Sequence, residues 1–186
     1  VKGLQGDNPN YLKTAACAKH FAVHSGPELV RHQFNAEVSQ KDLWETYLPA
    51  FKALVDVKVE AVMCAYNSTN GQPCCSNNYL ITDVLRKKWN FKGHVLSDCW
   101  ALQDLFLLYV KGHGIVKTQA EAAALAVKSG VSLNCGVTYN SLPDAVKEGL
   151  ITEKEIDSQL AILLKTRFKL GLFDPMGSNP YDAISP

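Results

Sequence analysis

The residues with the clearest potential for chemistry lie in the stretch 94–105, which reads HVLSDCWALQDL. Its short apolar run ends at Ser97, Asp98 and Cys99, and a helical pattern follows. A carboxylate at the end of a buried strand is in the usual place for a catalytic group if the strand belongs to a parallel barrel. An aspartate in this position also serves as the N-cap of a following helix. Both interpretations of Asp98 stay open at this level.

Composition and charge argue against several classes of protein. The chain has 186 residues, of which 47% are hydrophobic and 20% are charged, and its formal net charge is +1. This is the composition of one globular domain. The basic residues are dispersed, which predicts neither a nucleic-acid partner nor binding to an anionic membrane. No apolar run approaches the roughly 18 residues of a membrane span, and the first residues do not resemble a signal peptide.

The cysteines are too sparse for a disulfide scaffold. They are Cys17, Cys64, Cys74, Cys75, Cys99 and Cys135. All but the adjacent pair at 74 and 75 lie within or at the end of strand-like runs, where small buried thiols are common. The cysteines therefore predict core positions and do not identify the cellular compartment.

Strand and helix patterns alternate along the chain. Strand-like runs occupy residues 15–22, 61–66, 94–98 and 131–134, and helical patterns occupy 41–55, 78–89, 100–110, 119–128, 142–148 and 153–170. Pro49 should kink the first helix or start a new turn. The apolar stripe of the last helix, which includes Leu160 and Phe168, predicts core packing.

This alternation predicts a parallel sheet with helices outside it. A complete eight-stranded barrel needs about 250 residues. Roughly four βα units are therefore either a small doubly wound sheet or part of a barrel.

Polar side chains gather at the carboxyl ends of the predicted strands. In chain order the ends carry Lys19 and His20, then Tyr66 and Asn67, then Asp98, then Asn134. The carboxyl ends of parallel strands border the ligand site in such folds. This set suits a neutral polyhydroxylated ligand better than a phosphate, because no Gly-rich phosphate loop is present.

Two other chemistries are less favoured. Cys17, His20 and His24 have helical spacing for a metal ion, but residues three apart on a strand point to opposite faces. No paired C-x-x-C or H-E-x-x-H motif supports a zinc site. Cys99 is another candidate nucleophile, although as the neighbour of Asp98 it would face away from that side chain.

Five segments in order resemble glycoside hydrolase family 3, and within it the β-xylosidase/β-glucosidase branch. They are ACAKHFAVHSGPELVRHQF, VSQKDLWETYLPAF, VMCAYNSTNGQPCCSN, LRKKWNFKGHVLSDCWA and SLNCG. The tail GLFDP is similar to the end of the barrel domain of that family. The resemblance implies an α/β fold, a partial (β/α)8 TIM barrel of roughly four βα units from its later part, over residues 1–173. Residues 174–186 would begin an interdomain linker.

The resemblance also implies a role for particular residues. Asp98, in the SD motif, would be the nucleophile that forms a glycosyl-enzyme ester, and Tyr66, in the AYN motif, would orient it. Lys19 and His20 would hydrogen-bond hydroxyls of the sugar in the −1 subsite. Trp100 is an apolar platform for a sugar face or packs under the start of the next helix. The remaining substrate-binding candidates are Glu28, Arg31 and His32.

The sequence departs from one branch of the family. The β-N-acetylglucosaminidase branch carries an Asp-x-His dyad after the KH pair, which supplies the acid/base. Here Val30 holds the Asp position, so we expect His32 to lack the carboxylate that would orient it. In the glucosidase/xylosidase branch the acid/base is a Glu on a second domain. That domain and the first barrel strands are absent from these 186 residues.

The sequence therefore predicts a retaining, exo-acting β-glycosidase of the β-glucosidase/β-xylosidase type that works at non-reducing ends. The isolated chain should be nearly inactive, because loss of acid assistance alone removes a factor of about 10²–10⁴. Its partners would be a β-linked oligosaccharide or aryl glycoside, and the missing barrel strands and C-terminal domain of the parent chain. No metal, cofactor, nucleic acid or membrane is needed, and the resemblance implies a periplasmic or secreted location. The alternatives are a non-catalytic sugar-binding fragment or pseudoenzyme and, less favoured, a β-N-acetylglucosaminidase.

Overall fold

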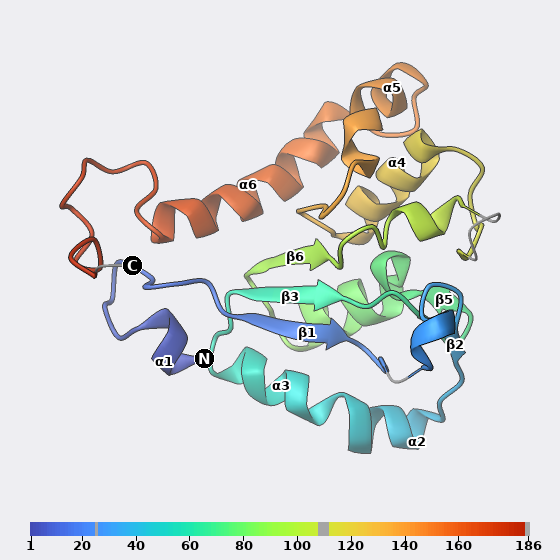
Figure 1. The fold of residues 1–186 in the computed structure, drawn as a ribbon, viewed down its shortest axis with the longest axis horizontal. Helices are drawn as coiled ribbons and strands as arrows, with labels where there is room; N and C mark the ends of the chain where they lie inside the picture. The colour runs from blue at the N-terminus through green and yellow to red at the C-terminus, as the bar shows by residue number, and fades with distance from the viewer. Residues whose placement is uncertain (25, 108–111, 185–186) are drawn as a thin grey trace.

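A parallel sheet lies at the centre of the computed structural model, which describes residues 1–24, 26–107 and 112–184. Its strands are β1 (Cys17–Phe21), β3 (Ala61–Cys64) and β6 (His94–Ser97), side by side in the order β1-β3-β6 (Figure 1). A single parallel bridge from Leu96 to Leu133 continues the sheet. The predicted parallel sheet is confirmed, except that the segment 131–134 contributes this bridge in place of a strand.

A second, smaller sheet lies beyond the carboxyl ends of β1 and β3 (Figure 1). In it β2 (Asn35–Ala36) runs parallel to β4 (Ser68–Thr69), which pairs antiparallel with β5 (Gln72–Pro73). This sheet ties the loop after β1 to the loop after β3, and both loops border the end of the sheet that carries Asp98.

Helices fill the connections between the strands. The longer ones are α3 (Pro49–Asp56), η4 (Tyr79–Lys88), α4 (Gln119–Ser129), α5 (Leu142–Lys147) and α6 (Glu153–Lys169). The shorter segments are α1 (Lys2–Gln5), η1 (Glu28–Val30), α2 (Gln40–Asp42), η2 (Leu43–Tyr47), η3 (Cys74–Ser76), η5 (Gln103–Leu105) and η6 (Thr138–Ser141). Pro49 begins α3, so it starts a new helix, in agreement with the prediction. None of the described helices combines the length and the apolar content that a membrane crossing needs.

The helix predicted over residues 100–110 is wrong where the structure describes it. Residues 99–102 form turns, and only the 3-10 helix η5 follows; residues 108–111 lie outside the described ranges. The reason is that Trp100 has a φ of 70° and its N–H donates to the carbonyl of Cys135 (2.7 Å), a residue distant in sequence. A positive φ is incompatible with a helical turn, and the bond to Cys135 accompanies this conformation.

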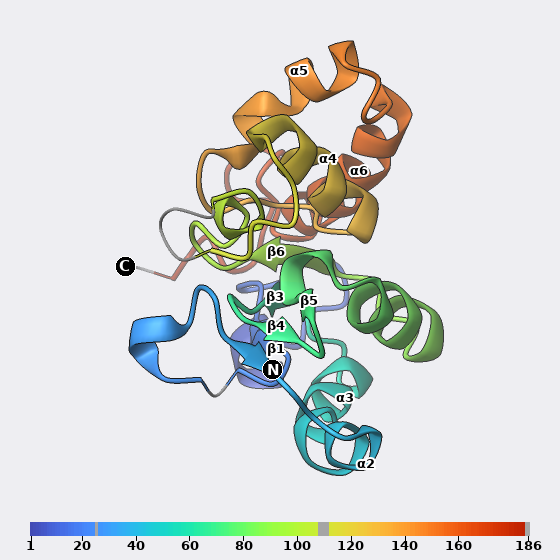
Figure 2. The same ribbon diagram turned by 90° about the vertical axis from the view of Figure 1, so that its right-hand side faces the viewer.

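The core lies between the parallel sheet and the helices on one of its sides. Val62 and Val95, partners in the β3–β6 register, are 0% exposed and belong to one cluster with Ile81 and Leu85 of η4. Seen from the end of the sheet, α3 and η4 lie together on that side (Figure 2). Burial of these branched side chains is the main favourable term that holds the strands in place.

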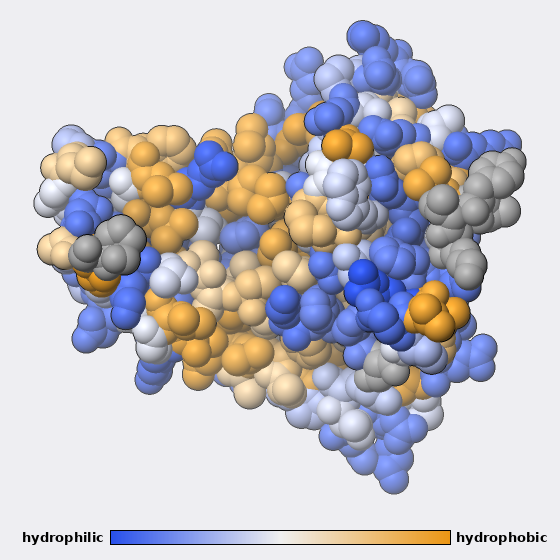
Figure 3. All heavy atoms as spheres, viewed as in Figure 1, coloured by the Kyte–Doolittle hydropathy of each residue, from blue (hydrophilic) through white to orange (hydrophobic). Residues whose placement is uncertain are grey.

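The other side of the sheet is less covered. Apolar surface runs across the middle of the view in Figure 3, over the strands. Only part of the α6 stripe that was expected to pack in the core does so. Ile156 is partly buried against a cluster that includes Ala120, Ala124 and Val127, whereas Leu160 is 44% and Phe168 60% exposed. Near its C-terminal end α6 meets the start of β3 through Thr166 and Lys169, which bind Glu60.

The cysteines also differ from the expectation. Cys64 pairs with Cys75, and Cys99 pairs with Cys135, in two disulfides. Cys17 is exposed, so of the strand cysteines none is a buried free thiol. The sequence did not reveal these pairs because the partners come together only when neighbouring strand ends and their loops meet.

Candidate active site

Asp98 follows the last residue of β6, at the carboxyl end of the sheet. Its Oδ1 accepts the N–H of Cys99 (2.8 Å), and its own N–H donates to the carbonyl of Cys64 at the end of β3 (3.3 Å). The side chain is 16% exposed. No helix begins here, so the structure gives Asp98 no role as an N-cap.

His20 is the side chain that contacts the Asp98 carboxylate. Its Nε2 lies 3.3 Å from Oδ2 of Asp98, and its ring centroid is 4.5 Å from that of His24. Burial lowers the pKa of His20, and the nearby negative charge of Asp98 opposes this effect. Lys19, predicted beside it, is exposed and forms no ion pair within the described residues. Of the two predicted residues, His20 therefore lies beside Asp98, and Lys19 is exposed to solvent.

Tyr66 lies at the end of β3, beside the loop that carries Asp98. It is 9% exposed, and its hydroxyl donates to the carbonyl of Cys99 (2.6 Å). Burial raises the pKa of Tyr66, and the charge of Asp98 raises it further, so the phenol stays protonated and can donate. Besides this contact with the peptide next to Asp98, a hydrogen bond to the Asp98 side chain also raises the pKa of Tyr66.

The loop after β1 brings three further candidates to the Tyr66 side of the site. The guanidinium carbon of Arg31 lies 4.8 Å from the centroid of the Tyr66 ring, and the His32 ring centroid lies 4.5 Å from it. Glu28 forms an ion pair with Arg31 (2.6 Å) while its side chain stays 77% exposed. Arg31 and His32 therefore contact Tyr66, and Glu28 contacts Arg31.

The expectation that His32 has no carboxylate partner is wrong. Its Nδ1 lies 2.8 Å from Oδ2 of Asp104, a buried residue of η5. The partner comes from the segment after β6, so the absence of an Asp at position 30 does not leave His32 unpaired. The argument drawn from Val30 against the hexosaminidase branch loses its force for the same reason.

Trp100 is held beside Asp98 with its indole toward solvent. The side chain belongs to a residue that is 50% exposed, so the alternative of core packing is wrong. Its backbone φ of 70° is unusual for a bulky residue. The bond from its N–H to Cys135 and the Cys99–Cys135 disulfide fasten this turn to the segment after Leu133. Gly136 in that segment has a φ of 140°, a conformation that residues with a side chain rarely adopt.

Two of the polar residues at the strand ends serve the fold. The Asn67 amide donates to the carbonyl of Val23 (3.2 Å) and is buried, and the Asn134 amide donates to the hydroxyl of Ser97 (3.2 Å). Both amides thus have partners within the fold, because strand ends need side chains that satisfy loop backbone and hydroxyl groups.

The sequence reasoning missed Asp104, His113 and the Cys99–Cys135 disulfide. His113 Nε2 lies 2.7 Å from the carbonyl of Tyr66, and its Nδ1 lies 3.1 Å from the hydroxyl of Ser68. Asp104 had a signal, because it is a charged residue inside an apolar run. His113 had none, because it belongs to no motif and is brought in by a turn.

The alternative chemistries find no support. Cys99 is in a disulfide, so its sulfur is not available as a nucleophile. Within residues 1–24, 26–107 and 112–184, no group of three or more His, Cys, Asp or Glu side chains is arranged to hold a metal ion.

A parallel sheet with a carboxylate, an imidazole and a phenol at the carboxyl ends of its strands is the arrangement of an α/β protein, either a barrel or a doubly wound sheet. Comparison with known proteins makes the assignment specific. The glycosyl hydrolase family 3 N-terminal domain matches residues 1–165, and the chain belongs to this family.

Relatives in the family include named xylosidases and glucosidases. The chain is 45% identical over 195 residues to a xylan 1,4-beta-xylosidase of Xylanibacter ruminicola. The matched region is 100% of the chain and 22% of that protein. A probable exo-1,4-beta-xylosidase of Neosartorya fischeri is 45% identical over 193 residues, with 99% of the chain and 24% of that protein covered. The chain thus spans about a quarter of the length of the curated relatives it matches.

Solved structures agree with the family and the fold. A family 3 exo-beta-xylosidase in complex with a xylobiose aziridine probe has a TM-score of 0.91 at 31% identity, covering 99% of this chain and 24% of that one. A beta-glucosidase from Listeria innocua in complex with glucose has a TM-score of 0.83 at 31% identity, covering 99% and 25%. The α/β TIM-barrel class expected from the resemblance is confirmed.

Proposed function

We propose that this chain is the nucleophile-bearing part of a retaining, exo-acting β-glycosidase of the β-xylosidase/β-glucosidase type. The observation that carries the proposal is the position of Asp98 at the carboxyl end of β6, with His20 3.3 Å away, in a family of glycosyl hydrolases. The 45% identity to a xylan 1,4-beta-xylosidase over the whole chain supports a β-linked xyloside as substrate.

The contacts of Asp98 favour one of its oxygens for the reaction. Oδ1 accepts the Cys99 N–H, and Oδ2, which lies 3.3 Å from Nε2 of His20, is the oxygen that we assign to attack on the anomeric carbon. The bond from Oδ2 to that carbon forms while the glycosidic bond breaks, and the departing oxygen takes a proton from an acid. Water then cleaves the ester, so the configuration is retained. The reaction needs no metal or cofactor.

The other side chains bind the sugar in this proposal. Lys19 and His20 donate to its hydroxyls, and contacts that tighten as the ring flattens lower the barrier. The half-exposed indole of Trp100 offers an apolar face for stacking. Arg31, between Glu28 and the Tyr66 ring, would contact the sugar from the loop after β1.

We also propose that the acid and the remaining barrel strands come from a longer chain, in which residues 1–173 form barrel and 174–186 begin a linker. A retaining glycosidase needs a second carboxyl about 5–5.5 Å from the nucleophile. Asp104 is engaged by His32 and is not free for that role. The exposed stripe of α6 supports a larger assembly, because such apolar surface is normally covered.

The test is covalent labelling with 2,4-dinitrophenyl 2-deoxy-2-fluoro-β-xyloside. Dinitrophenolate leaves without protonation, so labelling requires the nucleophile and the sugar subsite but no acid. We expect stoichiometric labelling of the peptide that contains Asp98, detected by mass spectrometry after digestion, and none in Asp98→Asn. The corresponding glucoside, run in parallel, ranks the two sugars.

Two outcomes would contradict the proposal. A label on a different carboxylate would remove Asp98 as the nucleophile. Binding of xylose by calorimetry, without labelling and without hydrolysis of an aryl xyloside by the full-length protein, would favour a non-catalytic sugar-binding protein.

A further inference from the structure

The buried carboxyl of Asp104 has no part in the proposed reaction. Asp104 is 5% exposed and lies in η5, six residues after Asp98. Its Oδ2 meets Nδ1 of His32 at 2.8 Å. Burial raises the pKa of Asp104 to about 6, while the hydrogen bond and charge of His32 and the charge of Arg31 oppose this rise. A buried carboxyl with a single imidazole partner needs a reason to be there.

The contacts of His32 define its tautomer. Arg31 Nε donates to Nε2 of His32 (3.3 Å), so Nε2 carries the lone pair and the proton is on Nδ1. That proton is donated to Asp104. The two hydrogen bonds therefore hold the imidazole in one orientation, with its ring against the ring of Tyr66.

Tyr66 carries the effect to the nucleophile. Its hydroxyl donates to the Cys99 carbonyl, and the N–H of Cys99 donates to Asp98. A second route starts from the backbone of Asp104, whose carbonyl accepts the N–H of His113 (2.6 Å). The imidazole of His113 in turn donates to the Tyr66 carbonyl (2.7 Å). Tyr66 is thus fixed through its ring and through its backbone, and both routes begin at Asp104.

We propose that Asp104 is a positioning residue for the nucleophile: through His32 and Tyr66 it holds the Asp98–Cys99 peptide so that the Asp98 carboxylate is aimed at the anomeric carbon. This inference rests on the proposed function. Asp104 acts on geometry and does not itself touch the sugar.

The test compares Asp104→Asn and Asp104→Leu in the full-length protein that carries this chain. Asparagine keeps an oxygen for His32 but loses the charge, and leucine loses both. Labelling with the dinitrophenyl 2-fluoro-xyloside measures the attack of Asp98 alone. We expect the labelling rate constant to fall by about 10-fold in the asparagine variant and about 100-fold in the leucine variant, because small misplacements of reacting groups have effects of this order. The exposed Asp144→Asn is the matched control and should label normally.

A pH profile separates positioning from mere folding. The charged or titratable groups that face Asp104 are His32 and Arg31 from the loop after β1, Tyr66 from the loop after β3 and His113 from the segment after residue 111. In the wild type, labelling should decrease as the pH falls through about 6 and Asp104 becomes neutral. Asp104→Asn, which is already neutral, should be slow at pH 7 and lose this step of the profile.

A double variant tests the route. If Asp104 acts through His32, adding Asp104→Asn to His32→Gln should slow labelling little further, because coupled residues are not additive. The proposal is overturned if Asp104→Asn labels within about twofold of the wild type with an unchanged profile, or if it does not fold. If the wild type itself is not labelled at Asp98, the proposed function fails instead.

Discussion

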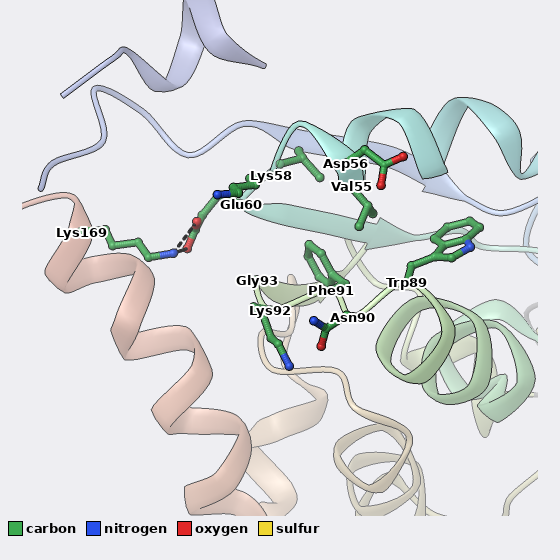
Figure 4. Close-up of a pocket in the computed structure, with 11 residues that line it drawn as sticks. Val55, Asp56, Lys58, Glu60, Trp89, Asn90, Phe91, Lys92, Gly93 and Lys169 are labelled. Atoms are coloured by element: carbon green, nitrogen blue, oxygen red, sulfur yellow. Dashed lines mark hydrogen bonds and ion pairs between the residues drawn. The ribbon is translucent and has the colours of Figure 1, made fainter. Parts of the chain in front are cut away.

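Two carboxylates at opposite ends of the parallel sheet show how differently one chemical group can be treated. Glu60, just before β3, is 5% exposed and accepts from the Thr166 hydroxyl (2.9 Å). It also accepts from the ammonium of Lys169 (2.8 and 3.0 Å) (Figure 4). Its N–H also donates to Gln5. Asp98, just after β6, has one backbone donor, an imidazole at 3.3 Å and the nearby Tyr66 phenol, and its side chain is 16% exposed.

The difference teaches that the number of hydrogen-bond partners of a carboxylate distinguishes a structural carboxylate from a catalytic candidate. The size of the neighbouring hollow does not. A hollow of about 360 Å³ lies beside Glu60, lined by Val55, Trp89 and Phe91 among others (Figure 4). The Glu60 carboxylate there accepts hydrogen bonds from Thr166 and Lys169 of α6, so we assign it a role in stability. The Asp98 side chain is 16% exposed against 6% for Glu60, and the proposed function assigns it to catalysis.

The largest expected effect is on activity. Asp98→Asn should reduce hydrolysis of an aryl β-xyloside by the full-length protein by about 10⁴-fold or more, because the nucleophile is lost. Its stability should stay within about 0.5 kcal/mol of the wild type, because the side chain has few partners to lose. Steady-state kinetics and the urea midpoint measure the two quantities. A large loss of stability in Asp98→Asn would mean that Asp98, like Glu60, also stabilises the fold.

Lys169→Met should give the opposite result. It leaves the Glu60 carboxylate buried with Thr166 as its remaining side-chain donor, so we expect a loss of about 2–4 kcal/mol in unfolding free energy. The labelling rate at Asp98 should not change. Lys147→Met, which breaks an exposed ion pair with Asp144, is the control and should cost less than about 1 kcal/mol. Equal losses of unfolding free energy in the two variants would show that the ion pair between Glu60 and Lys169 does not stabilise the fold more than an exposed one.

The two disulfides sharpen the comparison. Replacing Cys99 and Cys135 together by serine releases the turn that carries Asp98, and we expect labelling to slow by about 10-fold. Replacing Cys64 and Cys75 together should lower stability by about 2–3 kcal/mol with little change in labelling. The experiment fails to support this division if both pairs affect labelling equally.

The smallest effect is on the pH dependence of stability at the Glu60 end. Burial lowers the pKa of His94, whose Nδ1 lies 2.9 Å from the Thr166 hydroxyl; Glu60 opposes this shift, and Arg86 and Lys169 add to it. Below its ordinary pKa of 6.5 the unfolded chain therefore binds more protons at His94 than the folded one. His94 should thus contribute stability above that pH and lose it as the pH falls.

His94→Asn should flatten this slope. Urea midpoints between pH 5 and pH 7.5 measure the difference from the wild type, while His20, His113 and Asp104 titrate alike in both proteins. Identical slopes would show that His94 does not set the acid limit.

The sequence was sufficient for the groups that local pattern determines. The strands β1, β3 and β6, the helices α4 and α6, and the position of Asp98 at a strand end follow from periodicity, capping residues and apolar runs. His20 beside Asp98 followed from the expectation that parallel strands end at one edge.

What the sequence did not reveal depends on contacts between distant segments. The partner of His32 comes from residue 104 and the partner of Cys99 from residue 135, and no local pattern links these positions. The failed helix over 100–107 has the same origin, because the tie from Trp100 to Cys135 overrides the helical pattern. The exposure of Phe168 was missed because an apolar stripe does not say which surface covers it.

The backbone of Trp100 has a consequence for how this protein could evolve. A non-glycine residue in the left-handed region costs about 1–3 kcal/mol, and here that strain is stored under an indole that faces solvent. Trp100→Gly should therefore raise the melting temperature, which calorimetry measures. It should also weaken the binding of xylosides, which inhibition by xylose measures. Selection for thermal stability alone should favour replacement of Trp100. An aromatic residue kept at this position would therefore indicate that it is needed for ligand binding.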